Sequence, residues 1–248
     1  VAAIHPFYTA AIREFQAAGR AVVGSAPVGY DGTMGWLKAI GEAYGIAAEK
    51  VAAAQNAFGP AIKAALSATP IKGRITLSGY EGSELLVARL LIESGADVPY
   101  VGTACARNEW SAADREWLEA KGVAIKFRAS LEDDLAAMEG FKPDLAIGTT
   151  PLVQKAKALA IPSLYFTNLI SARPLMGPAG AGSLAQVVNA AIAGKDRMEG
   201  MKEFFAGVGE GDTSGIWEGA PNLRPDFRAI HQKKLDKAAK AAKAEEMI

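Results

Sequence analysis

The chain has 248 residues, of which 50% are hydrophobic and 22% are charged, as in an ordinary globular protein that buries a core. Its 27 Lys and Arg residues balance its 27 Asp and Glu residues, so its charge gives no argument for binding nucleic acid or an anionic membrane. No apolar stretch approaches the roughly 20 residues of a membrane-spanning helix, and the single cysteine, Cys105, excludes an internal disulfide and favours a cytoplasmic location.

Residues 1–70 combine helical patterns with one short strand, and they predict part of a preceding α/β domain with a helical linker. The chain opens on Val1 inside a helical pattern, so we expect a further N-terminal part. Thr33 is the expected N-cap of the second helix, which Gly45 ends, and Gly59-Pro60 is expected to kink or divide the third. The predicted elements are a helix over 7–18, a strand over 21–24, and helices over 33–44 and 47–68.

Residues 71–195 alternate short apolar runs with amphipathic segments, which predicts an α/β class fold: a Rossmann-like, doubly wound parallel sheet with flanking helical segments. Ser130, followed by two acidic residues, predicts the N-cap of the third helix. Residues 196–248 predict an irregular segment and a C-terminal helix rich in Ala and Lys. The predicted strands are 74–78, 98–102, 123–127, 145–148 and 163–166, and the predicted helices are 83–94, 112–121, 131–139, 153–159 and, after a Gly- and Pro-rich loop, 184–193.

Loops at the carboxyl ends of the strands are the expected ligand-binding region, because open parallel sheets bind ligands there. One of them, Gly79–Ser83, joins a strand to a helix whose free N–H groups suit an anion. Its spacing is neither a dinucleotide fingerprint nor a P-loop, and Glu81 would repel a phosphate. A plain turn and a ligand-facing turn both remain open. The other candidate loops are 103–110, 149–150 and 167–182.

Residues that commonly carry chemistry are sparse in this chain. Cys105 alone cannot hold a cluster or a zinc ion, so no metal site is predicted within the chain. His5 and His231 lie near opposite ends, and no catalytic triad or zinc motif occurs. The large aromatic side chains favour core or interface positions over stacking on a flat ligand: Trp110, Trp117 and Trp217.

Six segments, in chain order, resemble component-1 proteins of the nitrogenase superfamily, and together they cover about residues 19–194. The resemblance places the opening strand of that family's third domain at 73–79 and a strand of the type K-P-D-L-hydrophobic-I-G at 142–148. The six segments are GRAVVGSAPVG at 19–29, GRITLSG at 73–79, DVPYVGT at 97–103, KPDLAIG at 142–148, AIP at 160–162 and MGPAG at 176–180.

The resemblance points to the tetrapyrrole reductases of that superfamily, which include the light-independent protochlorophyllide reductases. Nitrogenases hold their iron–molybdenum cofactor partly with a histidine just after the last strand of this domain. Thr167 stands at about that place, and threonine cannot serve as that imidazole ligand. The tail WEGAPNLRPDFR at 217–228 is similar to the Y-type subunits of chlorophyllide a reductases.

This resemblance implies a subunit of an ATP-dependent, light-independent reductase that reduces the C7–C8 double bond of ring B of chlorophyllide a in bacteriochlorophyll synthesis. It implies a heterotetramer with a homologous Z-type subunit and a [4Fe-4S] cluster whose ligands lie outside this chain. It also implies an ATP-hydrolysing reductase that resembles the nitrogenase iron protein and carries ATP and Mg²⁺. Alone, the chain is expected to hold no cluster and to be inactive.

A flat, largely apolar tetrapyrrole needs an apolar cleft with a few polar anchors. The strand-end residues expected to line it are Tyr80, Thr149, Thr167, Asn168 and Leu169. Protons for the reduction are expected from the partner subunit, the substrate or a carboxylate such as Glu81. Two alternatives stay open: a non-catalytic scaffold of the same superfamily that binds a cofactor or tetrapyrrole, and a nucleotide-sugar enzyme with two Rossmann-like halves.

Overall fold

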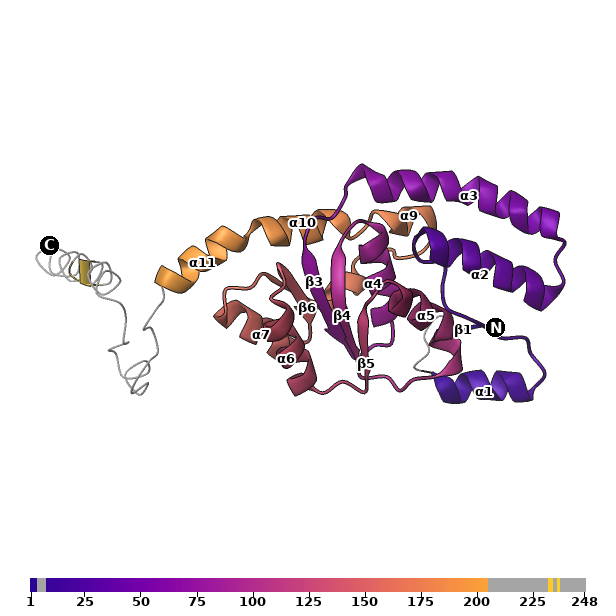
Figure 1. Ribbon diagram of the computed structural model, residues 1–248, viewed down its shortest axis with the longest axis horizontal. Coiled ribbons are helices and arrows are strands. Elements are labelled where there is room, and N and C mark those ends of the chain that lie inside the picture. The colour runs from indigo at the N-terminus through magenta and orange to yellow at the C-terminus, as the bar shows by residue number, and fades with distance from the viewer. Residues whose placement is uncertain (4–7, 205–231, 234–235, 237–248) are drawn as a thin grey trace, which may run out of the picture. The chain divides into compact units, whose positions relative to one another are not determined.

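The computed structural model describes residues 1–3, 8–204, 232–233 and 236 (Figure 1). The chain divides into two compact units, Val1–Lys195 and Asp196–Ile248. Helix α11 (Lys195–Phe204) begins at the last residue of the first unit and contains most of the described residues of the second. Of the predicted C-terminal helix, residues 232–233 and 236 are described, and they are helical. The tail at 217–228, His5 and His231 fall outside the described residues. None of the described helices is both long and apolar enough to cross a bilayer.

The centre of the first unit is a sheet of five parallel strands in the order β5-β4-β3-β6-β7, which confirms the predicted doubly wound fold. The central strands β3 and β6 are almost wholly buried, because helices cover both faces of such a sheet. The edge strand β5 alternates exposed and half-buried positions. The strands are β3 (Arg74–Gly79), β4 (Asp97–Thr103), β5 (Ala124–Phe127), β6 (Leu145–Gly148) and β7 (Ser163–Tyr165).

Two pairs of helices connect these strands, and each pair packs together: α4 with α5, and α6 with α7 (Figure 1). Helix α4 is the most deeply buried, since every residue from Glu84 to Leu91 is buried. Ser130 caps α6 in a capping box, as predicted, because its hydroxyl accepts from an N–H of the first turn. The helices are α4 (Glu84–Glu93), α5 (Ala112–Ala120), α6 (Leu131–Phe141) and α7 (Thr150–Ala158), with a short 3-10 turn over Glu109–Ser111 before α5.

The N-terminal segment departs from the prediction at three places. The chain opens on a short strand over Ala2–Ala3, paired in parallel with Val23–Gly24, and not inside a helix. Helix α2 begins at Gly29, so the expectation that Thr33 is its N-cap is wrong. The Thr33 hydroxyl lies inside the helix and donates to the Gly29 carbonyl at 2.6 Å. Helix α3 runs unbroken through Pro60, so it is not divided there. The elements are β1 (Ala2–Ala3), α1 (Thr9–Ala17), β2 (Val23–Gly24), α2 (Gly29–Tyr44), which Gly45 ends as predicted, and α3 (Ala48–Ala68).

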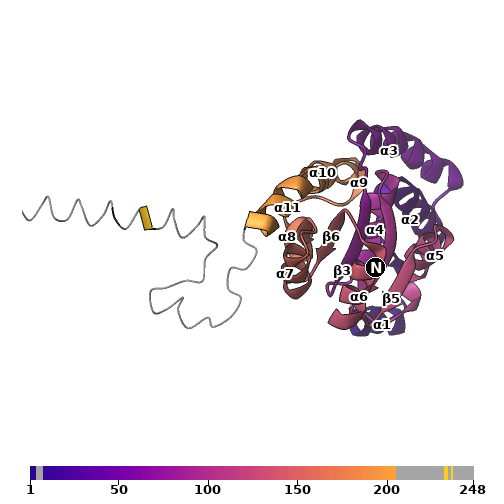
Figure 2. The same cartoon turned by 60° about the vertical axis from the view of Figure 1, so that its left-hand side comes forward.

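The segment after β7, predicted as a loop, contains two short helices before α10. Helix α8 begins directly at the end of β7, and α9 begins after the turn at Met176. Helix α9 lies beside α3 and thereby joins this segment to the N-terminal helices (Figure 2). The helices are α8 (Phe166–Ser171), α9 (Gly177–Ala181) and α10 (Ala185–Ala193).

Candidate functional site

The carboxyl ends of β3, β6 and β7 form the edge of the sheet where its strand order reverses, the usual place for a ligand in such folds. The Tyr80 and Tyr165 hydroxyls are hydrogen bonded at 2.9 Å across this edge. The Thr167 hydroxyl donates to a carboxylate oxygen of Glu81. The structure therefore brings predicted residues Tyr80 and Thr167 together, with Glu81 and Tyr165 beside them.

The two tyrosines of this edge differ in acidity because of their hydrogen bonds. Hydrogen bonding to Thr167, and then to Tyr80, lowers the pKa of Tyr165. The hydrogen bond to Tyr165 raises the pKa of Tyr80. Tyr165 is thus the more acidic of the pair, and it lies at the end of β7, which the sequence analysis treated only as strand.

The other predicted site residues lie apart from this network. Thr149 is half-buried at the N-cap of α7, and Asn168 is exposed on α8. Leu169 is 3% exposed and packs in the main hydrophobic core, where its side chain holds α8 against the sheet.

Glu84 shapes the loop that carries Tyr80 and Glu81. It is fully buried, and its carboxylate accepts from the N–H groups of Glu81 at 2.7 Å and Gly82 at 3.0 Å and from the Thr103 hydroxyl at 2.9 Å. Burial raises the pKa of Glu84, whereas these hydrogen bonds oppose that effect. A side chain at Gly79 would clash with the carboxylate, since its Cβ would lie 2.5 Å from Oε1. The carboxylate therefore fixes the turn from inside.

A cavity of about 490 Å³ opens next to this loop, within the 300–1,000 Å³ that is common for small-molecule sites. Three parts of the chain form it: the turn before α2, the start of α4, and the segment from the end of α8 to α9. An antiparallel bridge between Val28 and Met176 and a hydrogen bond from the Gly177 N–H to the Pro27 carbonyl at 2.9 Å close one side. The lining residues are Val28, Ser83, Leu86, Ile170, Ser171, Arg173, Pro174, Leu175 and Met176.

The 167–182 loop is among the predicted ligand-binding loops, but none of the individually predicted site residues lines this cavity. Its signals were the Met176-Gly177 turn and the position of the loop after the last strand. Arg173, Leu175 and Ser83 belong to no recognisable sequence motif. The cavity combines residues from three separate segments, which meet only in the folded chain.

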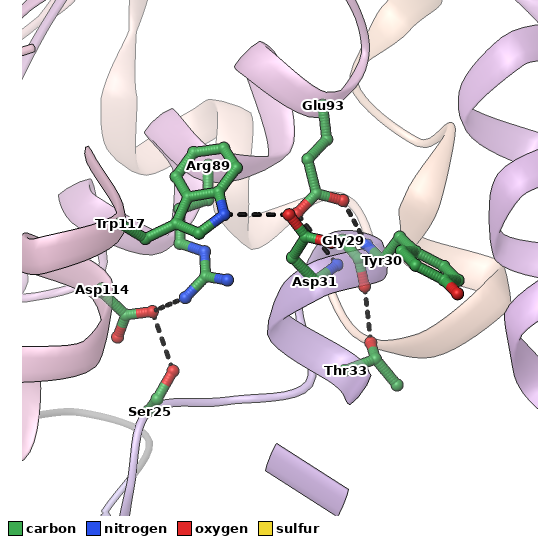
Figure 3. Close-up of polar contacts among 9 residues, drawn as sticks. All are labelled: Ser25, Gly29, Tyr30, Asp31, Thr33, Arg89, Glu93, Asp114 and Trp117. Carbon is green, nitrogen blue, oxygen red and sulfur yellow. Dashed lines mark hydrogen bonds and ion pairs between the residues drawn. The ribbon is translucent and has the colours of Figure 1, made fainter. Parts of the chain in front are cut away.

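A partly buried polar cluster fixes the turn that carries Val28 (Figure 3). Glu93 at the end of α4 accepts from the N–H groups of Tyr30 and Asp31, the latter at 3.2 Å, and so caps the first turn of α2. A Cβ at Gly29 would lie 2.5 Å from this carboxylate, and the φ of +67° at Gly29 also favours glycine. Helix α2 therefore starts before Thr33 because a carboxylate distant in sequence supplies the cap.

The same cluster contains a buried ion pair between α4 and α5. Arg89 Nη1 lies 2.6 Å from Asp114 Oδ1, which also accepts from the Ser25 hydroxyl at 2.8 Å. The Arg89 guanidinium stacks 4.9 Å from the ring centroid of Trp117, whose indole N–H donates to Asp31 at 2.9 Å (Figure 3). These contacts hold residues 25–31 against α4 and α5 and thereby position one wall of the cavity.

The described residues do not fit an iron–sulfur cluster. Cys105 is the chain's only cysteine; it is buried, and burial raises its pKa and disfavours the thiolate that binds iron. Within the described ranges, no group of three His, Cys, Asp or Glu side chains is arranged to hold a metal ion.

Trp110 is buried in a small cluster with Ile12 and Ala3.

The chain with this doubly wound sheet belongs to a recognised class of protein, the nitrogenase-type oxidoreductases. The chain matches the family described as "Nitrogenase component 1 type Oxidoreductase" over residues 1–193, and it belongs to that family. This confirms the predicted superfamily. Among solved structures, "Nitrogenase Cp1 at pH 6.5" is similar with a TM-score of 0.50 and 20% identity, covering 72% of this chain and 41% of that one, which shows the fold alone.

Two curated relatives are much more similar in sequence. The chain is 83% identical over 247 residues to the "Chlorophyllide reductase 52.5 kDa chain" of Cereibacter sphaeroides, which covers 100% of this chain and 49% of the relative. It is 75% identical over 248 residues to the protein of the same name from Rhodobacter capsulatus, covering 100% of this chain and 50% of the relative. The chain thus spans about half the length of the curated relatives it matches.

Proposed function

We propose that this chain is the tetrapyrrole-binding part of a Y-type subunit of a light-independent, ATP-dependent chlorophyllide a reductase, which reduces the C7–C8 double bond of ring B in bacteriochlorophyll synthesis. The observation that carries this proposal is the 83% identity, over the whole chain, to a protein named as a chlorophyllide reductase chain. Membership of the nitrogenase component 1 family supports a reductive reaction driven by a separate electron donor.

The cavity supports a tetrapyrrole as the ligand. Its walls are mainly aliphatic, and they lie beside the sheet edge where such folds bind ligands. Val28 and Leu86 supply apolar surface for a macrocycle, and Ser83, Ser171 and Arg173 supply polar anchors. Tyr80, Thr149, Thr167 and Asn168 are proposed to contact the pigment where it extends beyond the cavity, with Leu169 holding α8 in place.

The strand-end network is proposed to position polar hydrogens near the pigment. Thr167 donates to Glu81, and the two tyrosine hydroxyls are joined to each other at the same edge. Glu84 holds the backbone of this loop, so the network keeps its geometry when the pigment enters.

The [4Fe-4S] cluster of the complete enzyme is proposed to have all of its ligands outside this chain, because one buried cysteine cannot bind it. The proposed partners are a homologous Z-type subunit, in a heterotetramer, and an iron-protein-like reductase that hydrolyses ATP with Mg²⁺. A cytoplasmic location is also proposed, and the unpaired cysteine supports it.

An anaerobic assay of the full-length protein with its partner subunit tests this function. Chlorophyllide a, ATP and the iron-protein reductase are supplied, and the red absorption band of the pigment is followed. We expect a shift to a bacteriochlorin-type spectrum that disappears when ATP is omitted. Pigment binding without a shift would instead support a scaffold, and no binding would overturn the subunit assignment.

A further inference from the structure

The cavity lining carries one positive charge in a mainly apolar wall, which indicates what kind of ligand it can bind. Arg173 is its single ionisable residue, and none of the lining residues is acidic. The rest of the wall is two serines and six apolar residues: Val28, Leu86, Ile170, Pro174, Leu175 and Met176. A single cation in an otherwise apolar wall suits a ligand that is mostly hydrophobic and carries one negative group.

Arg173 is half-buried, between the end of α8 and the start of α9. Within the described part of the chain, no carboxylate lies within ion-pair distance of its guanidinium. Arg89 and Arg74, by contrast, pair with Asp114 and Asp97 at 2.6 and 2.7 Å. Arg173 is therefore a cation in a cavity wall whose hydrogen-bonding positions are open to a ligand.

Ser83 adds a second polar group to the same wall. It precedes α4, is 2% exposed, and its hydroxyl oxygen has no hydrogen-bond partner among the described residues. A buried hydroxyl without a partner is costly, and a ligand oxygen would relieve that cost. Glu84 already takes the N–H groups of Glu81 and Gly82, so those donors do not compete for the ligand.

We propose that Arg173 binds the free carboxylate of the pigment's propionate side chain, so that the site selects the acid over pigments whose propionate is esterified. This inference rests on the proposed function, which supplies the tetrapyrrole. As a chlorophyllide, the pigment retains a free carboxylate that an esterified chlorophyll lacks. The guanidinium fork matches a carboxylate in two parallel hydrogen bonds, and the apolar surroundings strengthen such a pair.

The expected preference for the acid is about tenfold or more, as is typical of a hydrogen-bonded charge pair at a partly buried position.

The test compares chlorophyllide a with its propionate methyl ester, by anaerobic equilibrium binding to the full-length protein and its partner, followed by pigment absorbance. The wild type is expected to bind the acid at least about tenfold more tightly than the ester. Arg173→Gln is expected to lose this preference and to bind the two pigments with similar affinity. Arg173→Lys is expected to keep part of the preference, since it keeps the charge without the planar fork.

Arg20→Gln is the matched control, because Arg20 is exposed and does not line the cavity. It is expected to leave the preference intact. Equal binding of acid and ester by the wild type, or an unchanged preference in Arg173→Gln, would overturn the inference while leaving the proposed function standing. If the wild type binds neither pigment, the proposed function fails and this inference fails with it.

Discussion

The ion pair between Arg89 and Asp114 gives the sharpest test of how the cavity wall is held. Both side chains are almost inaccessible, at 5% and 4%, and the charged atoms lie 2.6 Å apart. In Arg89→Met, the Asp114 carboxylate stays buried, and it keeps the hydrogen bond from the Ser25 hydroxyl. Removing one member of a buried pair typically costs about 3–5 kcal/mol, because the other charge is left uncompensated.

Urea unfolding, followed by tryptophan fluorescence, measures this cost. Trp117 stacks on the Arg89 guanidinium, so its emission reports the same cluster. With a slope of about 2–3 kcal/mol per molar urea, the expected loss lowers the midpoint by about 1–2.5 M. The double variant Arg89→Met/Asp114→Leu is expected to recover at least half of the loss, since no buried charge remains.

The matched control is Lys38→Met. Lys38 pairs with Glu42 at 3.8 Å, but these side chains are 72% and 69% exposed, so the expected cost is below about 0.5 kcal/mol. If Arg89→Met costs no more than Lys38→Met, or if the double variant is less stable than Arg89→Met, the buried pair does not hold this wall and the reasoning is refuted.

Three further predictions concern stability. In thermal unfolding, Gly102→Ala is expected to cost about 1–3 kcal/mol, because its Cβ would lie 2.0 Å from a carboxylate oxygen of Asp134. The control is Gly140→Ala, which is expected to gain about 0.5–1 kcal/mol because its Cβ would have nothing within 4 Å. Equal effects of the two substitutions would contradict this prediction. Burial raises the pKa of Asp134 from 3.8 to about 6, so its contribution to stability is present below about pH 4 and is lost as the pH rises through about 6. Asp134→Asn is expected to reduce the dependence of the urea midpoint on pH between about pH 4.5 and 7.5. An unchanged pH dependence would show that another group causes it. In urea unfolding, Ser130→Ala is expected to cost about 1 kcal/mol, because it removes the oxygen that caps α6. The control Ser67→Ala, inside a helix, is expected to be near neutral. A neutral Ser130→Ala would show that the capping box contributes little to stability.

The sheet and its crossover helices could be predicted from sequence because their signals are local. Strand β6 is a continuous apolar run, β3 places Ile75 and Leu77 in the core, and both strands match the predicted ones to within one residue. The N-cap of α6 is a serine followed by acidic residues, and the structure confirms it. Gly45, which ends α2, adopts the left-handed conformation that favours glycine.

The features that could not be predicted depend on contacts between distant segments. Helix α2 starts four residues before Thr33 because Glu93, more than 60 positions away, caps it. Helix α3 tolerates Pro60 without ending. Helices α8 and α9 are too short, and α9 too rich in glycine and proline, to give a clear periodicity.

The candidate site shows the same limit. Tyr80 follows β3 and Thr167 follows β7, the two strands on either side of β6. Both residues therefore lie at the same edge of the sheet, as the structure shows. The cavity combines Val28, Ser83 and Arg173, and no spacing in the sequence relates them. Leu169 shows the reverse case, since a residue at a strand end packs into the core when a helix begins there.

Binding of chlorophyllide a to a cavity-filling variant tests most directly whether this chain supplies the tetrapyrrole site. Ser171 lines the cavity and is exposed, so Ser171→Trp fills the space without disturbing the core, and Lys157→Trp places the same side chain on an exposed position of α7 outside the cavity. With the full-length protein and its partner, Ser171→Trp is expected to weaken pigment binding at least about tenfold, and Lys157→Trp to leave it unchanged. Equal affinities in the wild type and Ser171→Trp would contradict the placement of the pigment in this cavity.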